Sequence, residues 1–344
     1  MLHRMLARRF TAAAAKLPIL ASDAEVLQRL RANVPDHTKA DILACYSSAV
    51  GGIVTDAAMM HIPVDDHGFH RGHCVFDTTS VDDGKAFGLT MHLERLLGSA
   101  RQAKIIDALT DGSALRESLR SIILQTIAAT GRRECVFVRY WLTAGRGDFS
   151  ISPKNCTPPN FYCIAQVDMH SADKPRGLSA AIVPVPLKPP LLATMKSNNY
   201  LINALVAMEA EARGADQGIQ IGDDGLLAES SVATIAVVDA RGVLRSPPAS
   251  NILSSTTWMR VQELSAKLVA DGLLNGCSTE PVRREELGEA TEILTLGGGW
   301  VEPIIALDGQ PVGSDGLPGR VWRALDTAVR ADFHNPDYTD LVPY

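Results

Sequence analysis

A lysine in an apolar setting is the first residue of this sequence that could do chemistry. Lys196 lies in the stretch LLATMKSNNYLINAL, between an apolar, strand-like segment and a predicted helix. Burial disfavours the charged form of an amine, so a lysine flanked by buried structure has a lowered pKa and is a usable nucleophile toward an aldehyde. A single lysine is nevertheless most often an ordinary solvated side chain.

Glu229 lies further along the chain in a setting of a similar kind. The residue falls in DDGLLAESSVATIAVV, at the junction of two apolar runs typical of β-strands. A carboxylate held in a largely apolar setting needs a cationic partner, and the protonated nitrogen of a pyridine ring is one such partner. A rim residue that faces water fits the same pattern.

Two groups of residues have the chemistry to bind a phosphate. Arg95, in LTMHLERLLGSA, shares a predicted helical face with His92 and Ser99, and its rigid guanidinium fork suits a phosphate. Thr256 and Thr257 end a run of four Ser and Thr residues before a predicted helix, where backbone N–H groups and hydroxyls converge. A solvated surface arginine and a simple helix cap explain the same residues without a ligand.

The histidines do not form a convincing metal-binding pattern. His67, His70 and His73 are spaced by three, a spacing that lines a metal site when it falls on a helix. Gly68 and Gly72 disfavour a helix there, so we expect no metal ion. The sequence also lacks the G-x-S-x-G, Walker and H-E-x-x-H motifs, so hydrolase, nucleotide triphosphatase and zincin functions have no support.

The overall composition narrows the class of protein. Lys and Arg number 33 against 39 Asp and Glu, a net charge of −6, and no basic stripe alternates with aromatics. We therefore expect a soluble protein without a nucleic-acid partner. No run of about 18 apolar residues is present, so we expect no membrane span. The six cysteines are scattered without a CxxC pair, as in ordinary reduced proteins.

A mixture of helices and strands must position these candidate residues. Helices are predicted over residues 24–42, 90–106, 114–130, 199–213 and 257–270, and strand-rich runs over 46–54, 75–89, 135–145, 161–169 and 179–187. Asp-Gly and Arg-Gly pairs at 83–84, 224–225, 241–242 and 308–309 indicate hairpin turns. Hairpins and helices in both halves indicate an α+β protein rather than a doubly wound parallel sheet.

The chain is long enough for two domains, and one polar segment separates them best. The stretch HSADKPRG at 170–177 contains Pro and Gly and is predicted to be a linker. It divides the chain into an N-terminal α+β domain over residues 24–169 and a C-terminal domain over residues 178–344.

The N-terminus has the composition of a targeting segment. Arg4, Arg8, Arg9 and Lys16 occur there, and no acidic residue precedes Asp23. Basic, acid-free segments of this kind are typical of transit peptides for the mitochondrion or the plastid, and we assign residues 1–23 to one. The alternative is an exposed helical extension of a cytoplasmic protein.

Two blocks of the sequence resemble one known family. The stretch HRGHCVFDTTSVDDGKAFGLTMHLERLLGSA has the HRG turn, Phe-Asp strand, hairpin and His-Leu-x-Arg-Leu helix of class IV (fold type IV) aminotransferases. The stretch KSNNYLINALVAMEAEARGADQGIQIGDDGLLAES is similar to the cofactor block of the same family, and the resemblance runs from about residue 45 to the C-terminus. Within the family, VPLKPPLLATMKSNNYL and the terminal LVPY look like plant-type D-amino-acid transaminases, which are similar in turn to aminodeoxychorismate lyases.

The resemblance implies pyridoxal 5'-phosphate as the cofactor and a catalytic role for a lysine. Lys196 would form the covalent imine with the cofactor and then move the proton at the α-carbon of the substrate. Glu229 would keep the pyridine nitrogen protonated, so that the ring accepts electrons from that carbon. Tyr200, at the Asn-Tyr-Leu position, would lie near the ring hydroxyl.

The same resemblance implies residues for the two anionic groups of the reaction. Arg95 would bind the cofactor phosphate, and the backbone of Thr256 and Thr257 would complete the cradle. Arg139, in FVRYW, matches a position that meets a substrate carboxylate in branched-chain relatives.

Three departures from the family pattern touch cofactor affinity. Ser255 stands where the family usually has a Gly before the phosphate-binding pair, which tightens that turn. Gly297 stands where a later loop commonly offers a hydroxyl to the phosphate. Ser230 and Thr234 replace the Gly and Asn that usually follow the glutamate.

The resemblance therefore implies a fold, an assembly and a reaction. The expected fold is a smaller N-terminal domain and a larger C-terminal domain with a barrel-like sheet, with the cofactor between them and a homodimer as the assembly. The expected reaction moves an amino group between an amino acid, first of all a D-amino acid such as D-alanine, and a 2-keto acid. The alternatives are an aminodeoxychorismate lyase, a branched-chain aminotransferase, and a non-catalytic descendant that keeps the fold.

Overall fold

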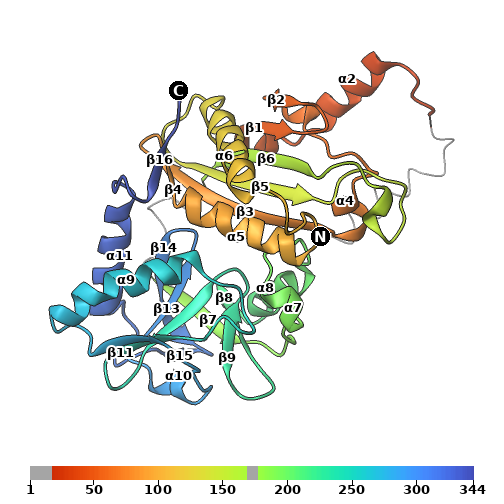
Figure 1. The fold of residues 1–344 in the computed structure, drawn as a ribbon. Helices are drawn as coiled ribbons and strands as arrows, with labels where there is room; N and C mark the ends of the chain where they lie inside the picture. The colour runs from red at the N-terminus through yellow and green to blue at the C-terminus, as the bar shows by residue number, and fades with distance from the viewer. Residues whose placement is uncertain (1–17, 169–176) are drawn as a thin grey trace.

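The computed structural model describes residues 18–168 and 177–344 of the chain. The predicted transit peptide and the predicted linker fall largely outside these two stretches. Within them, helices and strands are mixed in both halves, which confirms the predicted α+β class (Figure 1). None of the helices in these stretches is long and apolar enough to cross a membrane.

The first sheet is built mainly from the N-terminal half of the chain. Within the described residues it has seven strands in the order β16-β4-β3-β5-β6-β1-β2, all antiparallel. The strands are β1 (Ile42–Ser47), β2 (Gly52–Val54), β3 (Cys74–Asp82), β4 (Lys85–Phe87), β5 (Val136–Thr143), β6 (Asn160–Val167) and β16 (Thr339–Leu341). β3 and β4 form the predicted hairpin, where Asp83 and Gly84 have the positive φ angles, 48° and 71°, of such a turn.

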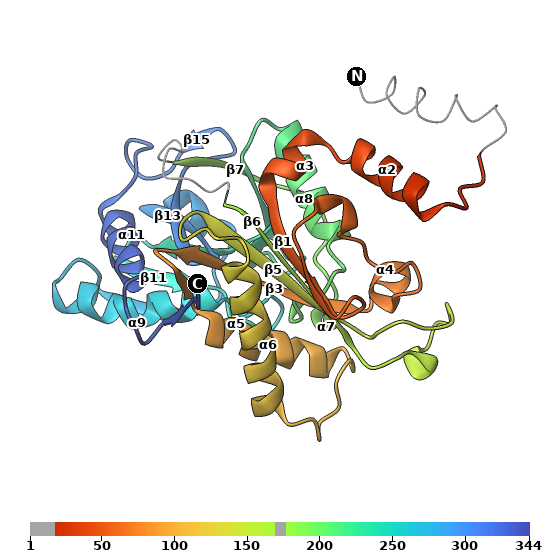
Figure 2. The same ribbon diagram turned by 90° about the horizontal axis from the view of Figure 1, so that it is seen from above.

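Two helices cover one face of this sheet. They are α5 (Leu89–Gln102) and α6 (Gly112–Ala128), which lie across the strands (Figure 2). The predicted apolar face of α5 is buried against the sheet through Leu93, Leu96, Leu97 and Ala100. Since side chains alternate along a strand, the other residues of β3 and β5 project from the opposite face, toward the rest of the molecule.

The second sheet contains a closed ring of strands. The described residues give it nine strands, of which six follow the order β10-β13-β14-β7-β8-β9, and β9 returns to β10 through the pair Glu229↔Thr234. This ring corresponds to the predicted barrel-like sheet. The strands of this sheet are β7 (Leu178–Ile182), β8 (Gln217–Ile221), β9 (Leu227–Ser230), β10 (Thr234–Val238), β11 (Val243–Ser246), β12 (Gly276–Thr279), β13 (Glu292–Gly297), β14 (Trp300–Leu307) and β15 (Gln310–Pro311).

Helices of the second half pack on this sheet and between the two sheets. α9 (Thr256–Ala270) and α11 (Arg320–Asp332) pack on each other and on β13. α8 (Leu201–Ala212) packs on β7 and β8, and the short α7 (Pro190–Ala193) precedes it. The remaining short helices are η2 (Ala57–Met59), η3 (Pro153–Asn155) and α10 (Glu286–Glu289).

The helix predicted over residues 24–42 is two helices. α2 (Asp23–Asn33) and α3 (Asp36–Asp41) are separated because Val34 precedes Pro35, and the residue before a proline avoids the helical region. Val34 is extended, with ψ of 121°. Neither helix buries a residue, and α2 extends away from the body in both views (Figures 1 and 2).

The expectation that glycines prevent a helix near His67 was wrong. A short helix, α4 (His67–Arg71), forms there. Asp66 caps it by accepting a hydrogen bond from the Gly68 N–H at 2.8 Å, and Gly72 ends it with a left-handed φ of 67°. Both glycines therefore serve the ends of a single helical turn rather than its interior.

The C-terminal tail pairs with the first sheet rather than with the strand ring. The chain runs through α11, which was not predicted, and then returns to the first sheet, where β16 pairs with β4. The edge of β4 offers unpaired backbone groups that a returning strand satisfies. The tail therefore belongs to the first sheet, and the division at 170–177 remains a prediction for the rest of the chain.

Candidate active site

A cavity of about 540 Å³ lies between the first sheet and one end of the strand ring. All the residues predicted to bind cofactor or substrate line it: Arg95, Arg139, Lys196, Tyr200, Glu229, Thr256 and Thr257. Its apolar and aromatic lining includes Phe76, Phe137, Trp141, Met195 and Trp300. Residues far apart in the sequence are thus brought to one space that is lined by both charged and aromatic side chains.

Alternate residues of two neighbouring strands form the wall on the side of the first sheet. In the β3–β5 register, Phe76 lies opposite Trp141 and Thr78 lies opposite Arg139. All four line the cavity, because residues paired across an antiparallel sheet point to the same side. The wall therefore presents an arginine within a mainly aromatic surface.

Lys196 is held by its backbone against the start of β3. Its N–H donates a hydrogen bond to the Ser99 hydroxyl at 3.2 Å, and its carbonyl accepts one from the Phe76 N–H at 2.9 Å. Its side chain is half-buried in the cavity, where Nζ donates to the Tyr200 hydroxyl at 3.3 Å. Nζ also lies 4.8 Å from the centre of the Phe76 ring. The amine is therefore fixed at the wall, with its tip in the cavity.

The environment makes this amine unusually acidic. Burial disfavours the charged form, and the nearby positive charge of Arg95 adds to the effect, so that the pKa of Lys196 falls from 10.5 to about 8.

In the ligand-free protein, reaction of Lys196 with an aldehyde is expected to speed up with pH and to level off above about pH 8, because only the neutral amine is nucleophilic. Borohydride trapping of pyridoxal phosphate on Lys196 at a series of pH values measures this. A rate that still rises toward pH 10.5 would mean that Lys196 has the pKa of an ordinary lysine.

Arg95 reaches the cavity from α5 and is held by a buried carboxylate. Its Nε and Nη2 donate to the two oxygens of Asp77 at 2.9 and 2.8 Å, and Nη1 donates to the Ser254 carbonyl at 3.0 Å. Burial raises the pKa of the fully buried Asp77 carboxyl, but the charges of Arg95 and His92 outweigh burial and hold that pKa well below its usual range. The pair fixes the guanidinium in one orientation at the cavity.

Sequence reasoning did not identify Asp77 as a functional residue. It lies in the strand segment VFDTTSV, whose other residues are apolar or small, and it is completely buried. A carboxylate in such a segment needs a cationic partner, and this need could have identified Asp77 from the sequence. The face of α5 was read correctly, since His92, Arg95 and Ser99 all contact the site or its supports.

The N-terminus of α9 lies beside Arg95. Ser255 caps the helix by accepting a hydrogen bond from the Trp258 N–H at 3.1 Å, so the predicted departure at this position serves as the helix cap. The first N–H groups of a helix have no partner within the helix and favour an anion. Thr257 accepts a hydrogen bond from the Gly299 N–H at 3.2 Å, which ties the helix start to the β13–β14 turn.

Gly297 ends β13 at the edge of the cavity and leaves little room for a side chain. A Cβ there would lie 3.3 Å from the Ala233 Cβ and 3.4 Å from the Trp300 ring. The hydroxyl that the family commonly offers at this position is therefore replaced by close packing of backbone against Trp300.

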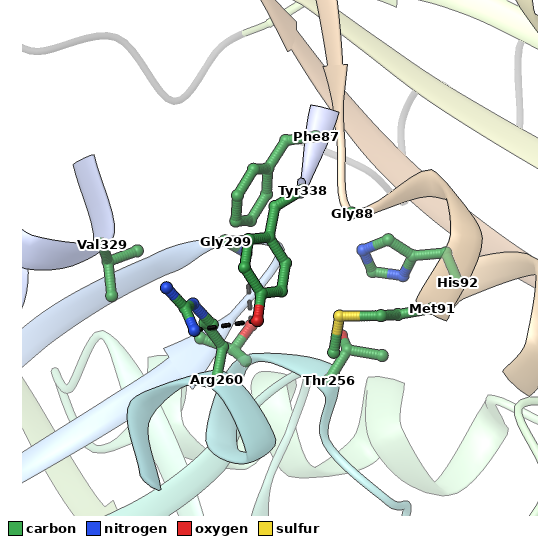
Figure 3. A pocket seen from close by; sticks show the side chains of 10 residues that line it. Phe87, Gly88, Met91, His92, Thr256, Arg260, Gly299, Val329 and Tyr338 are labelled. Carbon is green, nitrogen blue, oxygen red and sulfur yellow. Dashed lines mark hydrogen bonds between the residues drawn. The ribbon is translucent and has the colours of Figure 1, made fainter. Parts of the chain in front are cut away.

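A second hollow shares Thr256 and Thr257 with the cavity but is much smaller. It measures about 10 Å³, room for about one water molecule, and lies among Met91, His92, Gly299 and the pair Arg260–Tyr338 (Figure 3). Arg260 donates a hydrogen bond to the Tyr338 hydroxyl at 2.9 Å. The hollow is therefore too small for a cofactor.

Glu229 lies where the strand ring closes and is paired with a second lysine. Its Oε1 lies 3.2 Å from Nζ of Lys188, and both side chains are nearly buried. Lys188 was not predicted to be a site residue. It is a charged residue among the prolines and apolar residues of VPVPLKPPLL, and such a residue needs a partner of opposite charge, as Asp77 does. Ser230, the next residue, closes the turn to β10 by donating to and accepting from the backbone of Ala233.

Arg139 presents a guanidinium without a partner for one of its donors. Its Nε is buried and makes no hydrogen bond among the described residues. Burial lowers the pKa of this guanidinium, and its carbon lies 5.7 Å from the centre of the Phe137 ring. Arg139 lines the cavity, where its guanidinium is suited to an anionic ligand.

Two of the three histidines near α4, His67 and His73, hydrogen-bond to backbone carbonyls of distant segments. Nδ1 of His67 and Nδ1 of His73 lie 3.2 Å apart, and each ring donates from Nε2 to a carbonyl, that of Ser150 and that of Ala103. Within residues 18–168 and 177–344, no group of three or more His, Cys, Asp or Glu side chains is arranged to hold a metal ion.

The side chains that line the cavity match the chemical groups of pyridoxal phosphate. A phosphate suits Arg95 and the start of α9, an aldehyde suits the amine of Lys196, and a protonated ring nitrogen suits Glu229. The guanidinium of Arg139, which also lines the cavity, suits a further anionic group such as a substrate carboxylate.

Comparisons with known proteins point to the same chemistry. The family model described as amino-transferase class IV matches residues 74–305. A "D-amino-acid transaminase, chloroplastic" from Arabidopsis thaliana is 40% identical over 306 residues, which cover 88% of this chain and 80% of the relative. A putative branched-chain-amino-acid aminotransferase from Methanocaldococcus jannaschii is 27% identical over 267 residues, which cover 76% of this chain and 88% of the relative. The solved branched-chain amino acid aminotransferase of Escherichia coli has the same fold, with a TM-score of 0.75 at 21% identity, over 88% of this chain and all of that one.

Proposed function

Since the chain belongs to the class IV aminotransferase family, we propose that it uses pyridoxal phosphate to transfer the amino group of a D-amino acid, such as D-alanine, to a 2-keto acid. The observation that carries the proposal is the cavity that is lined at once by Lys196, Glu229 and the N-terminal residues of α9, Thr256 and Thr257. The likeness to the Arabidopsis transaminase supports a D-amino acid as the donor.

Each residue of the cavity has one task in this proposal. Bound pyridoxal phosphate supplies an aldehyde and a ring that accepts electrons. Lys196 would hold the cofactor through its amine and, with that amine free again, would move the proton at the substrate α-carbon. Glu229 would accept a hydrogen bond from the protonated ring nitrogen, and Arg95 would hold the phosphate. Tyr200 orients the Lys196 amine through their hydrogen bond.

The substrate carboxylate is assigned to Arg139. Replacing Arg139 by methionine is expected to raise KM for both D-alanine and the keto acid by about 10- to 100-fold, because a charge-assisted hydrogen bond to the carboxylate is lost. Steady-state kinetics with the variant measure this, and Arg330→Met, an exposed arginine on α11, is the control. A variant with unchanged KM and reduced kcat would place Arg139 outside substrate binding.

The choice of reaction and of substrate is tested by one set of assays. The purified protein with pyridoxal phosphate is given D-alanine or L-leucine with 2-oxoglutarate, and aminodeoxychorismate in a parallel reaction. Turnover of D-alanine supports the proposal, turnover of L-leucine alone supports branched-chain transamination, and pyruvate from aminodeoxychorismate without a keto acid supports the lyase. A protein that stays colourless with added pyridoxal phosphate would instead be a non-catalytic descendant of the fold.

A homodimer is proposed as the working assembly. Leu201, Leu205 and Met208 are 73%, 43% and 61% exposed on one side of α8, at the spacing of a helical face. A stripe of apolar side chains on the surface suits a second copy of the chain, in keeping with the resemblance that implies a dimer. Light scattering should give twice the mass of the chain, and charged residues at these three positions should give a monomer.

An organelle is proposed as the location. The basic, acid-free composition of the first 22 residues supports this, and the printed name of the Arabidopsis relative places that protein in the chloroplast. Fusion of residues 1–23 to a fluorescent protein tests the assignment, and a diffuse cytoplasmic signal would reject it.

A further inference from the structure

Lys188 is a second lysine in the cavity, and the proposed reaction does not use it. It follows β7 in the segment VPVPLKPPLL and is only 9% exposed. Its Nζ lies 3.2 Å from Oε1 of Glu229 and 5.4 Å from the centre of the Tyr200 ring. Because Nζ of Lys196 lies 5.8 Å from the same ring, both amines gather around Tyr200.

A charged lysine at this depth requires a reason. Moving a charge out of water is unfavourable unless a partner of opposite charge is close, and Glu229 is that partner. The 3.2 Å contact with Lys188 is made by Oε1 of Glu229, and Glu229 also lines the cavity. The carboxylate of Glu229 thus has one oxygen held by Lys188 and a second oxygen that can accept from another donor.

We propose that Lys188 is a positioning residue that holds one oxygen of Glu229 and leaves the other for the ring nitrogen of the cofactor. The inference rests on the proposed function, since it assigns the second donor to pyridoxal phosphate. Lys188 also balances the charge of Glu229 before the cofactor arrives and keeps the carboxylate oriented. In the loaded protein the protonated ring nitrogen is a second cation on the same carboxylate.

Removal of Lys188 should therefore change the stability of the ligand-free protein and that of the loaded protein by different amounts. Without Lys188, Glu229 loses the cation that it contacts in the ligand-free protein, whereas the bound cofactor would supply another. Loss of Lys188 therefore destabilises the ligand-free protein more than the loaded one. If Lys188 only filled space in the cavity wall, its loss would destabilise the two forms equally.

The test measures Tm with and without pyridoxal phosphate. Lys188→Met is expected to lower the Tm of the ligand-free protein by about 5 °C and that of the loaded protein by about half as much or less. Lys188→Arg keeps the charge and should retain both wild-type values. Lys267→Met, which removes a lysine that is 79% exposed on α9, is the matched control and should change neither.

A cofactor analogue with C–H in place of the ring nitrogen separates this role from general effects of ligand binding. The analogue should stabilise Lys188→Met no more than it stabilises the wild type, whereas pyridoxal phosphate should stabilise the variant more. Equal losses of Tm in the ligand-free and loaded variant overturn the inference alone. A wild type that pyridoxal phosphate does not stabilise overturns the proposed function and this inference together.

A second variant decides the matter if Lys188→Met does not fold. The double variant Lys188→Met, Glu229→Gln removes both charges and should fold without the cofactor, because neither charge is left unpaired. A double variant that is destabilised by the sum of the two single effects shows no coupling between the residues and overturns the inference.

Discussion

Replacement of Lys196 by alanine is expected to lower kcat for D-alanine by at least about 10³-fold, because one side chain both binds the cofactor and moves the proton at the α-carbon. The same variant should lose the borohydride-reducible adduct at position 196, which mass spectrometry of the digested protein detects. Tm in the ligand-free state should change little, since Lys196 is held mainly by its backbone.

Two further observations make this result specific. Lys267→Ala, in which an exposed lysine is removed, should keep full activity and the adduct. A small amine added to the Lys196→Ala enzyme should restore part of the rate, because it supplies a base in the space that the side chain leaves. An adduct that persists at another lysine, with activity intact, would remove Lys196 from the mechanism.

Replacement of Arg95 by methionine is expected to have two separate effects. The free energy of unfolding should fall by about 3 to 5 kcal/mol, because the buried carboxylate of Asp77 loses its charged partner. The Kd for pyridoxal phosphate should rise by about 10- to 100-fold, because the phosphate loses a charge-assisted hydrogen bond. Denaturant unfolding measures the first effect and absorbance titration the second.

A double variant separates the structural from the binding role of Arg95. Asp77→Asn in the Arg95→Met background removes the unpaired charge and should restore most of the stability without restoring cofactor affinity. Arg101→Met, an exposed arginine on the same helix, should leave both quantities unchanged. Recovery of affinity together with stability would mean that Arg95 acts on the fold and does not bind the phosphate.

Much of the local structure could be predicted because its cause is local. The Asp83-Gly84 turn follows from the backbone angles that these residues tolerate, and the face of α5 follows from the spacing of its leucines. The candidate site residues came from the resemblance to a known family, and the structure brings these residues to one cavity.

The features that were missed depend on contacts between distant segments. No local pattern shows that Thr339–Leu341 pairs with β4, because the pairing depends on where α11 directs the chain. Asp77 and Lys188 could have been noticed as charges within apolar segments, but their partners, Arg95 and Glu229, are known only once the chain is folded. The proline that divides α2 from α3 was a local signal and was overlooked.

A crystal structure of the protein with pyridoxal phosphate tests the central claim most directly. We expect continuous density from Nζ of Lys196 to the cofactor, the ring nitrogen within hydrogen-bond distance of Glu229, and the phosphate at Arg95 and the start of α9. A cofactor bound with its phosphate elsewhere, or with its ring nitrogen away from Glu229, would contradict this account.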